Sequence, residues 1–519
     1  MDGNTIQILI AMIIYMAAVI GIGLVYAKRA NKNSEAYFLG GRSLGPWVTA
    51  MSAEASDMNG WLLMGLPGVA YWYGLADAFW TAFGLAVGTY LNWLFVSKRL
   101  RRYSVRANNS ITLPEFFSNR FRENKKTIML LSAAFILIFF TAYASSCFVT
   151  CGKLFSTLFG ADYVSMMILG AVFVLAYTLL GGFLAESASD FMQAIVMIVA
   201  LTVIVVLGTV NAGGFGQVIA NAKEIPGFLE FFGLATPALD ATGTQIVENG
   251  KPLFGAASDY GILTVCSMMA WGLGYFGMPQ VLLRFMAIRR EDELKRSRRI
   301  AMIWVGISLA VAVFIGIVGR QVFPTAHLTK SAAENIFITM STSYLPPIIA
   351  GFVMAGILAA TISSSDSYLL IAASAFAKNI FQGICKKNAS EKQVMWVSRL
   401  TLLVLAMVGI LLALDEKSII FDIVSFAWAG FGATFGPLML FSLFWKRINK
   451  PGAIAGMVSG ASMVFLWKLV ISKLGGVFAI YELLPAFVFS SICIVVVSLL
   501  TKAPSQEVLE DFEAVKAGN

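Results

Sequence analysis

Uncharged apolar runs of helical length recur along the whole chain of 519 residues. Residues 8–26 and 302–318, for example, contain no charged side chain. About 20 apolar residues are enough for a helix to cross a bilayer. The pattern therefore predicts an all-α polytopic membrane protein that forms one transmembrane domain over residues 1–519. Thirteen spans are expected, at about residues 6–27, 47–72, 75–97, 127–157, 163–182, 186–210, 258–286, 300–322, 344–377, 396–415, 419–445, 451–471 and 479–501.

The composition agrees with this class. Hydrophobic residues make up 58% of the chain and charged residues only 13%, whereas about 25% of the residues in a soluble domain are charged. Because so few charges cannot cover a soluble protein of this size, the composition excludes a soluble enzyme, a nucleic-acid binder and a disordered chain. The expected surroundings are a lipid bilayer, and no nucleic acid is expected as a partner.

The formal net charge of +9 comes mainly from basic side chains in short loops. The loops after spans 1, 3, 7, 9 and 11 are rich in lysine and arginine, and the loops on the other side hold few. Cytoplasmic loops carry such an excess. We therefore expect the N-terminus outside and the C-terminus in the cytoplasm. The remaining soluble pieces are a basic loop at residues 98–126, an external segment at about 211–259 and a short polar tail from residue 501.

Span 2 contains a polar interruption, which reads SAEASDMNGW at residues 52–61. Asp57 falls near the bilayer midplane, where a carboxylate without a partner costs at least ~2.5–3.5 kcal/mol. Serine, aspartate, asparagine and glycine also make a poor helix. One interpretation is a polar group that bonds a neighbouring helix. The other is an unwound stretch whose carbonyls and carboxylate face a cation.

Span 7 contains a second interruption, WGLGYFGMP at residues 271–279. Alone it is a weak signal, because membrane helices tolerate glycine and proline. However, span 2 opens one set of five spans and span 7 opens the next. Paired interruptions of this kind are typical of transporters built from inverted repeats around a midplane site. We therefore expect repeats at about residues 47–210 (spans 2–6) and 258–445 (spans 7–11), followed by two extra spans and the tail at 451–519.

Span 9 carries a serine-rich stretch, AATISSSDS at residues 359–367. Ala360, Ser363 and Ser364 are spaced i, i+3, i+4 and share one helix face. Two hydroxyls and a backbone carbonyl are hard oxygen ligands, which suit an alkali or alkaline-earth ion. The small number of full negative charges favours a monovalent ion. The alternative is that the hydroxyls bond carbonyls of their own helix.

Several motifs together resemble the sodium:solute symporter family, and within it the branch that transports proline. The motifs are LGGRSLGP at 39–46, ASDM at 55–58, GWLLMGLPG at 60–68, FFTAY at 139–143, GGFLA at 181–185, WGLGYFG at 271–277, AWAGFGA at 427–433 and LLTKAPS at 499–505. The resemblance covers nearly the whole chain. It implies thirteen helices, an external N-terminus and a five-plus-five inverted repeat. It also implies sodium-coupled import of L-proline by alternating access in the bacterial inner membrane, with no enzymatic activity and no obligate protein partner.

The resemblance further implies roles for individual residues. Co-transported sodium would bind the carbonyls of Ala55, Met58 and Ala360 and the hydroxyls of Ser363 and Ser364. Asp57, Asp190 and Arg42 would couple sodium to transport, with Asp190 in a hydrated position at the cytoplasmic end of span 6. The substrate pocket would be formed by Asn59, Gly60, Trp61, Tyr143, Trp271, Tyr275 and Pro279.

Three residues depart from the family pattern. Asn59 replaces a serine expected to touch substrate, Glu54 replaces a glycine, and Asp366 replaces a small polar residue. Because of Asn59, a sodium symporter for another small amino acid or a carboxylate such as pantothenate stays an alternative. A transporter-like solute sensor is a second alternative, although no signalling domain follows the last span. An integral membrane enzyme is a third, and no histidine-rich, cysteine-rich or Ser-His arrangement supports it.

Overall fold

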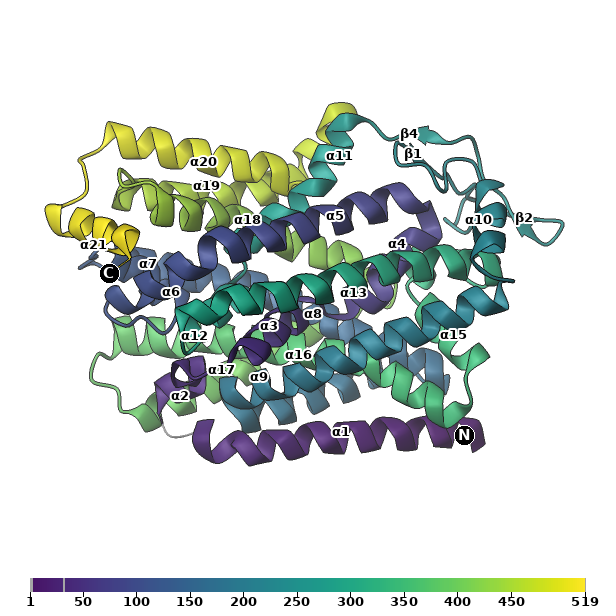
Figure 1. Cartoon of the computed structure of the whole chain (residues 1–519), viewed down its shortest axis with the longest axis horizontal. Helices are drawn as coiled ribbons and strands as arrows, with labels where there is room; N and C mark the ends of the chain where they lie inside the picture. The colour runs from purple at the N-terminus through teal and green to yellow at the C-terminus, as the bar shows by residue number, and fades with distance from the viewer. Residues whose placement is uncertain (1–2, 31–32, 519) are drawn as a thin grey trace.

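A computed structural model describes residues 3–30 and 33–518. Most of the long helices run side by side in one bundle, and the two chain ends lie at opposite ends of that bundle (Figure 1). Within the described residues, ten helices are long and apolar enough to cross a membrane, and an eleventh span is formed if one bent pair is counted. The protein is therefore an all-helical polytopic membrane protein, and the same part of the chain contains four strands of two residues each.

The α-helices have the following bounds: α1 Gly3–Ala30, α2 Ser34–Leu39, α3 Pro46–Asp57, α4 Leu66–Tyr73, α5 Leu75–Leu91, α6 Ser97–Arg106, α7 Leu113–Arg120, α8 Thr127–Phe159, α9 Tyr163–Asn211, α10 Phe215–Lys223, α11 Ile262–Met269, α12 Pro279–Ala287, α13 Leu294–Val322, α14 Lys330–Ala333, α15 Ile336–Tyr344, α16 Pro347–Ser374, α17 Glu391–Leu412, α18 Ile420–Phe444, α19 Lys450–Leu469, α20 Leu483–Leu500 and α21 Gln506–Ala517. The strands are β1 Gly233–Leu234, β2 Val247–Glu248, β3 Lys251–Pro252 and β4 Ser258–Asp259, paired antiparallel as β1 with β4 and β2 with β3.

The two further spans expected from the sequence coincide with shorter or broken helices. One is the apolar helix Tyr163–Leu179, which forms the first part of α9. Gly182, with φ 59° and ψ −179°, interrupts α9 and separates this part from the second, Gly182–Asn211. A positive φ costs glycine little, which is why the chain can reverse there. The other is the segment that contains α3 and α4.

Both expected helix breaks are present. In span 2, α3 ends at Asp57, and a π-helical turn at Trp61–Gly65 leads into α4. In span 7, a 3-10 segment at Ala270–Gly277 separates α11 from α12, and the axis bends by 43°. The division of the chain into two inverted repeats stays a prediction.

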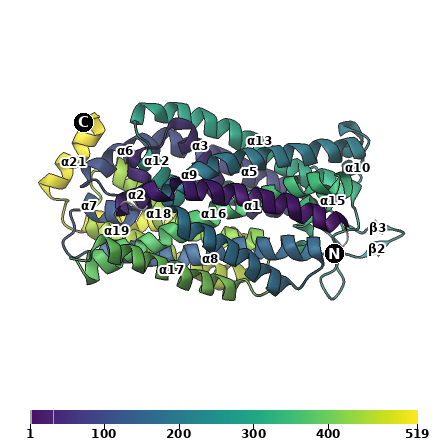
Figure 2. The same cartoon turned by 90° about the horizontal axis from the view of Figure 1, so that it is seen from below.

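The central helices are almost fully buried, whereas α1 runs along the outside of the bundle against α9 and α16 (Figure 2). Glycines allow the broken span 7 to approach α5 closely. A Cβ added at Gly88 would lie 2.2 Å from the carbonyl oxygen of Gly272. Small residues at helix crossings permit such backbone contact.

The segments between spans gather at the two ends of the bundle (Figure 1). The strands and α10 lie at the end that holds the N-terminus, and α2, α6, α7 and α21 lie at the other end. The basic loop contains more helix than a loop would, because α6 directly continues the span formed by α5. The polar tail forms the amphipathic helix α21, whose buried Phe512 faces the guanidinium of Arg120 and whose Asp511 pairs with Arg106.

Candidate cation and substrate site

The oxygen face predicted on span 9 meets the end of α3. The hydroxyl of Ser363 donates to the carbonyl oxygen of Ala55 at 2.8 Å, and the hydroxyl of Ser364 donates to the same oxygen at 3.3 Å. Ser363 also donates to the carbonyl of Ala360 at 3.2 Å within its own helix. All these residues are fully buried. The structure thus brings together four oxygen atoms from Ala55, Ala360, Ser363 and Ser364.

Met58 lies in the break itself. Its torsion angles, φ −96° and ψ 82°, are not helical. A residue with such torsions turns its carbonyl away from the hydrogen-bonding pattern of the helix before it. The neighbouring helix α13 contacts Met58 through its side chain, since Ser308 Oγ lies 3.8 Å from the sulfur.

Asp57 is the last residue of α3 and has no exposed surface. Its carboxylate accepts hydrogen bonds from the Tyr275 hydroxyl at 2.8 Å and from Gln280 Nε2 at 3.3 Å. No described lysine or arginine forms an ion pair with it. An ionised carboxylate buried without a cation is costly, so this position favours the approach of a cation that the chain itself does not supply.

Aromatic side chains surround the two breaks. The rings of Trp61 and Trp271 lie 6.2 Å apart, and Tyr143 of α8 stacks on Tyr368 of α16 at 4.2 Å. The indole N–H of Trp271 and the hydroxyl of Tyr143 are buried and have no hydrogen-bond partner in the described part of the chain. Such groups are usually paired in native proteins. They are therefore available to a polar ligand.

The remaining residues of the predicted pocket shape its backbone. Asn59 accepts the N–H of Trp61 at 2.9 Å and donates to Ser146 Oγ at 3.3 Å, so it caps the restarting helix and links it to α8. Gly60 packs on Thr150, whose hydroxyl would lie 2.2 Å from an added Cβ. Pro279 begins α12 at its first turn, where its missing N–H is not needed.

Arg42 lies outside this cluster, at the end of the bundle that holds α6 and α21. Its guanidinium donates to the carbonyls of Met286 at 2.6 Å and Ser110 at 2.8 Å, and to the side chains of Ser104 and Asn109. It therefore ties the segment before α3 to the end of α12. Burial lowers the pKa of Arg42 to about 10, so the side chain keeps its charge at neutral pH.

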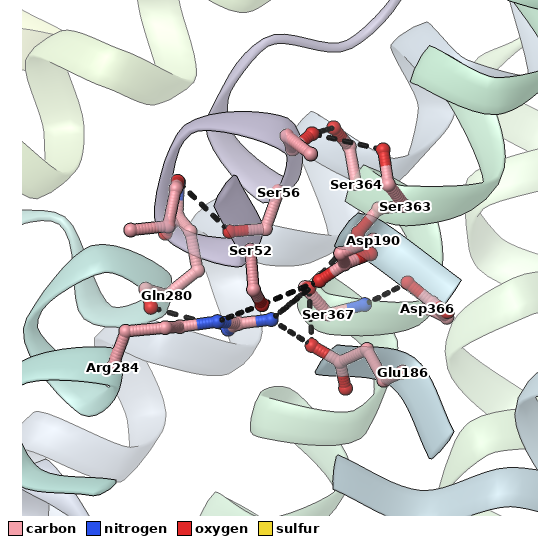
Figure 3. A network of polar contacts seen from close by, with 12 residues as sticks. Ser52, Ser56, Glu186, Asp190, Gln280, Arg284, Ser363, Ser364, Asp366 and Ser367 are labelled. Carbon is pink, nitrogen blue, oxygen red and sulfur yellow. Dashed lines mark hydrogen bonds and ion pairs between the residues drawn. The ribbon is translucent and has the colours of Figure 1, made fainter. Parts of the chain in front are cut away.

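The hydrated position expected for Asp190 is wrong. Asp190 is fully buried, and its Oδ2 accepts from Ser52 at 2.6 Å and from Arg284 of α12 at 3.2 Å (Figure 3). The second half of α9 begins at Gly182, before the expected start of span 6 at residue 186, so Asp190 lies about two turns inside the helix and not at its end. Asp190 is thus part of an ion pair beside α3, one hydrogen bond away from Ser52 on the helix that carries Ala55.

The chain matches the model of the sodium:solute symporter family over residues 37–460. The chain belongs to the sodium:solute symporter family. It is 42% identical over 512 residues to the sodium/proline symporter of Haemophilus influenzae, with 97% of each chain covered. It is 41% identical to the high-affinity proline transporter PutP of Bacillus subtilis, covering 94% of this chain and 97% of that one. The sodium/proline symporter of Escherichia coli is 40% identical, over 98% and 96%.

Solved structures of transporters share the fold of this symporter-family chain. A Na+-coupled sialic acid symporter in a substrate-bound, outward-open state superposes with a TM-score of 0.75 at 19% identity, covering 96% of this chain and 99% of that one. Mhp1, a nucleobase-cation-symport-1 family transporter, superposes with a TM-score of 0.53 at 12% identity, covering 92% and 98%. At these identities the likeness concerns the fold alone.

Three residues of the site were not found from the sequence: Arg284, Gln280 and Tyr368. Arg284 gives a detectable signal, because an arginine inside an apolar span usually has a functional or structural partner. Gln280 and Tyr368 give no such signal, since the sequence does not reveal which neighbouring helix a single polar or aromatic side chain on a membrane helix faces. Glu54, the acid that departs from the family pattern, accepts a hydrogen bond from Trp93 Nε1 at 3.0 Å.

Proposed function

We propose that this chain is a sodium-coupled secondary transporter that imports L-proline by alternating access. The relatives named sodium/proline symporters are about 40% identical over nearly the full chain, which supports both the driving ion and the substrate. Membership of a symporter family supports a transporter rather than an enzyme. Sodium is then a co-transported substrate and not a resident cofactor.

The observation that carries the proposal is the meeting of oxygen ligands at the break in span 2. Ser363 and Ser364 reach Ala55 across two helices that are far apart in the sequence, with hydroxyl–carbonyl distances of 2.8 and 3.3 Å. We assign sodium to this face, with the carbonyls of Ala55, Met58 and Ala360 and the two hydroxyls as ligands. Asp57 supplies negative charge nearby, and Asp190 and Arg42 affect coupling from more distant positions.

We assign the substrate to the adjoining aromatic cluster. Trp61, Trp271, Tyr143 and Tyr275 offer apolar faces that suit a pyrrolidine ring, and the backbone around Asn59, Gly60 and Pro279 suits a carboxylate. The start of α12 supports this assignment, because the N-terminus of a helix favours negative charge. The unpartnered Tyr143 hydroxyl and Trp271 N–H support it as well.

The energy available to one sodium ion is sufficient for concentrative uptake. One charge moving through about 100 mV releases about 2.3 kcal/mol, and a tenfold sodium gradient adds about 1.4 kcal/mol. Together these terms support roughly a 500-fold accumulation of substrate at one-to-one stoichiometry.

We also propose a bacterial cell-membrane location with the N-terminus outside and the C-terminus in the cytoplasm. The basic segments before α3, in α6 and after α12 lie at the same end of the bundle as α21 (Figure 1). An excess of lysine and arginine supports the cytoplasmic assignment of that end.

The test is uptake of labelled proline into proteoliposomes with and without an inward sodium gradient. We expect uptake that requires sodium and is competed by unlabelled proline. Absence of sodium-driven proline uptake, together with sodium-driven uptake of labelled pantothenate or of another small amino acid, would favour the alternative cargo. Sodium-independent binding without uptake would favour the solute sensor and contradict the proposal.

A further inference from the structure

Three buried acids and one arginine meet between α9, α12 and α16 (Figure 3). Arg284 forms ion pairs with Glu186 and with Asp190, and its guanidinium also donates to Ser367 Oγ at 2.9 Å. Asp366 accepts the backbone N–H of Ser367 at 2.8 Å. None of the four charged residues is more than 3% exposed.

The charges in this cluster do not balance. One guanidinium neutralises one carboxylate, and in the described part of the chain no other lysine or arginine pairs with Glu186, Asp190 or Asp366. Burying an uncompensated charge costs several kcal/mol. A carboxyl group in such a place binds a proton or a cation instead. The cluster therefore holds positive charge that Arg284 alone does not provide.

The geometry indicates where that charge binds. Each of the three acids has one buried oxygen without a hydrogen-bond partner in the described residues: Glu186 Oε2, Asp190 Oδ1 and Asp366 Oδ2. Of the three, Glu186 and Asp366 also line a cavity of about 10 Å³ at the Gly182 break, together with Tyr177, Thr178 and Leu370, and Asp190 does not. This is close to the smallest volume that admits one water molecule. A proton fits the space, and the volume is just enough for one water molecule to accept it.

We propose that Glu186 is a proton-binding site whose proton is released when sodium binds. The proposal rests on the sodium site assigned above. Glu186 suits the role because its Oε1 already accepts from Arg284 and Ser367, so the ionised form has donors. Asp366 accepts only the backbone N–H of Ser367 and has no ion pair in the described residues, so its ionised form has fewer donors than that of Glu186.

Charged and titratable groups near Glu186 come from several elements. Arg284 lies on α12, Asp366 on α16, Asp190 and Tyr177 on α9, and Tyr37 on α2. Arg399 of α17 acts on Tyr37 from farther away. Arg284 is the cation that contacts Glu186 directly, and it is shared with Asp190. A second positive charge near the cluster therefore has a large effect on whether Glu186 keeps its proton.

Hydrogen bonds connect Glu186 to the sodium face. Ser367 Oγ contacts Glu186 Oε1 and lies 2.9 Å from the carbonyl oxygen of Ser363, whose own hydroxyl donates to Ala55. A cation held by Ala55 and Ser363 favours the ionised form of Glu186 through this short path. The O–H bond at Oε2 then breaks, the electron pair stays on the oxygen, and the proton passes to water at the Gly182 break.

The experiment uses the purified full-length protein in weakly buffered detergent solution with a pH indicator. Sodium chloride is added, with choline chloride as the ionic control, and sodium binding is followed separately by the sodium-specific change in tryptophan fluorescence. We expect about one proton released per sodium bound by the wild type. E186Q is expected to bind sodium and to release about one proton fewer. D366N, the matched control in the same cavity, is expected to release as many protons as the wild type.

The pH dependence of sodium affinity provides a second measurement that does not depend on a variant. Because binding is reciprocal, the half-saturating sodium concentration should fall by up to about tenfold for each unit by which the pH is raised, over the range in which sodium displaces the proton of Glu186. Affinity independent of pH in the wild type, proton release that persists in E186Q, or release lost only in D366N would each overturn the proposal. Absence of sodium-dependent proline uptake in proteoliposomes would contradict the proposed function itself.

Discussion

Alanine at position 363 or 364 removes one hydroxyl oxygen from the cation face and leaves α16 intact, because alanine is a strong helix former. A contact between a hydroxyl and a charge is worth about 1.5–3 kcal/mol. A hydroxyl that turns toward a cation gives up the hydrogen bond to Ala55, which is worth about 1 kcal/mol when well formed. The free energy lost with this hydrogen bond reduces the net contribution of the hydroxyl to sodium binding, and the reduction differs between the two serines.

Ser363 makes the better hydrogen bond to Ala55, at 2.8 Å, so its net contribution is about 0.5–2 kcal/mol and S363A should raise half-saturating sodium roughly 2- to 30-fold. Ser364 makes a longer hydrogen bond to Ala55, at 3.3 Å, so it gives up less free energy when it turns toward the cation. S364A should therefore raise half-saturating sodium roughly 10- to 100-fold. High sodium should restore much of the maximal rate in both variants.

The assay is sodium-dependent uptake of labelled proline in proteoliposomes across a wide sodium range. S365A is the matched control, because the Ser365 hydroxyl donates to Thr361 of its own helix at 2.6 Å and faces away from α3. Sodium dependence that is damaged in S365A and unchanged in S363A and S364A would refute the assigned ion position.

Four further outcomes are expected. D57N should abolish sodium-coupled uptake, since a neutral amide cannot match a partly desolvated cation; wild-type sodium affinity and rate in D57N would contradict the role of Asp57. W271A should raise half-saturating proline by at least about tenfold, because about 1.5 kcal/mol of apolar contact is lost; a lower yield of folded protein with unchanged half-saturation would show that Trp271 only packs. N59S should sharpen selectivity for proline over its analogues, and an unchanged competition profile would show that Asn59 does not face substrate. Burial and Arg320 lower the pKa of His327 from 6.5 to about 4, so the unfolded chain binds more protons and stability falls as pH drops from about 6.5 to about 4. The loss is about 2 kcal/mol at about pH 5, and the unfolding temperature should therefore fall more between pH 7 and pH 5 in the wild type than in H327Q.

Local features of the sequence were enough to predict the helices and their breaks. The length of each apolar run sets where a helix can cross a bilayer. The asparagine, glycine and proline at Asn59, Gly60 and Pro279 act on their own backbone, so their effect on the helices is visible without any partner. The face formed by Ala360, Ser363 and Ser364 could be predicted for the same reason, because it follows from helical periodicity alone.

The partners of the buried charges could not be predicted in this way. Asp190 was expected at a hydrated end of a span, and the structure pairs it with Arg284, which lies 94 positions away in the chain. The tail was expected to be short and polar, and the structure adds that it forms a helix that docks on α6 and α7 through Phe512 and Asp511. Both outcomes depend on which helices are neighbours and how deep each one starts.

The sequence alone therefore specified the class of protein, the membrane-spanning helices and the oxygen-rich face on span 9, since these depend on composition and on the periodicity of a single helix. The tertiary structure decided that this face meets Ala55, that Asp57 is held by Tyr275 and Gln280, and that Glu186 shares Arg284 with Asp190. The physical reason is that a buried polar group is stabilised by whichever partner the packing brings within hydrogen-bond distance. Packing between distant segments is a property of the assembled bundle and not of any one helix.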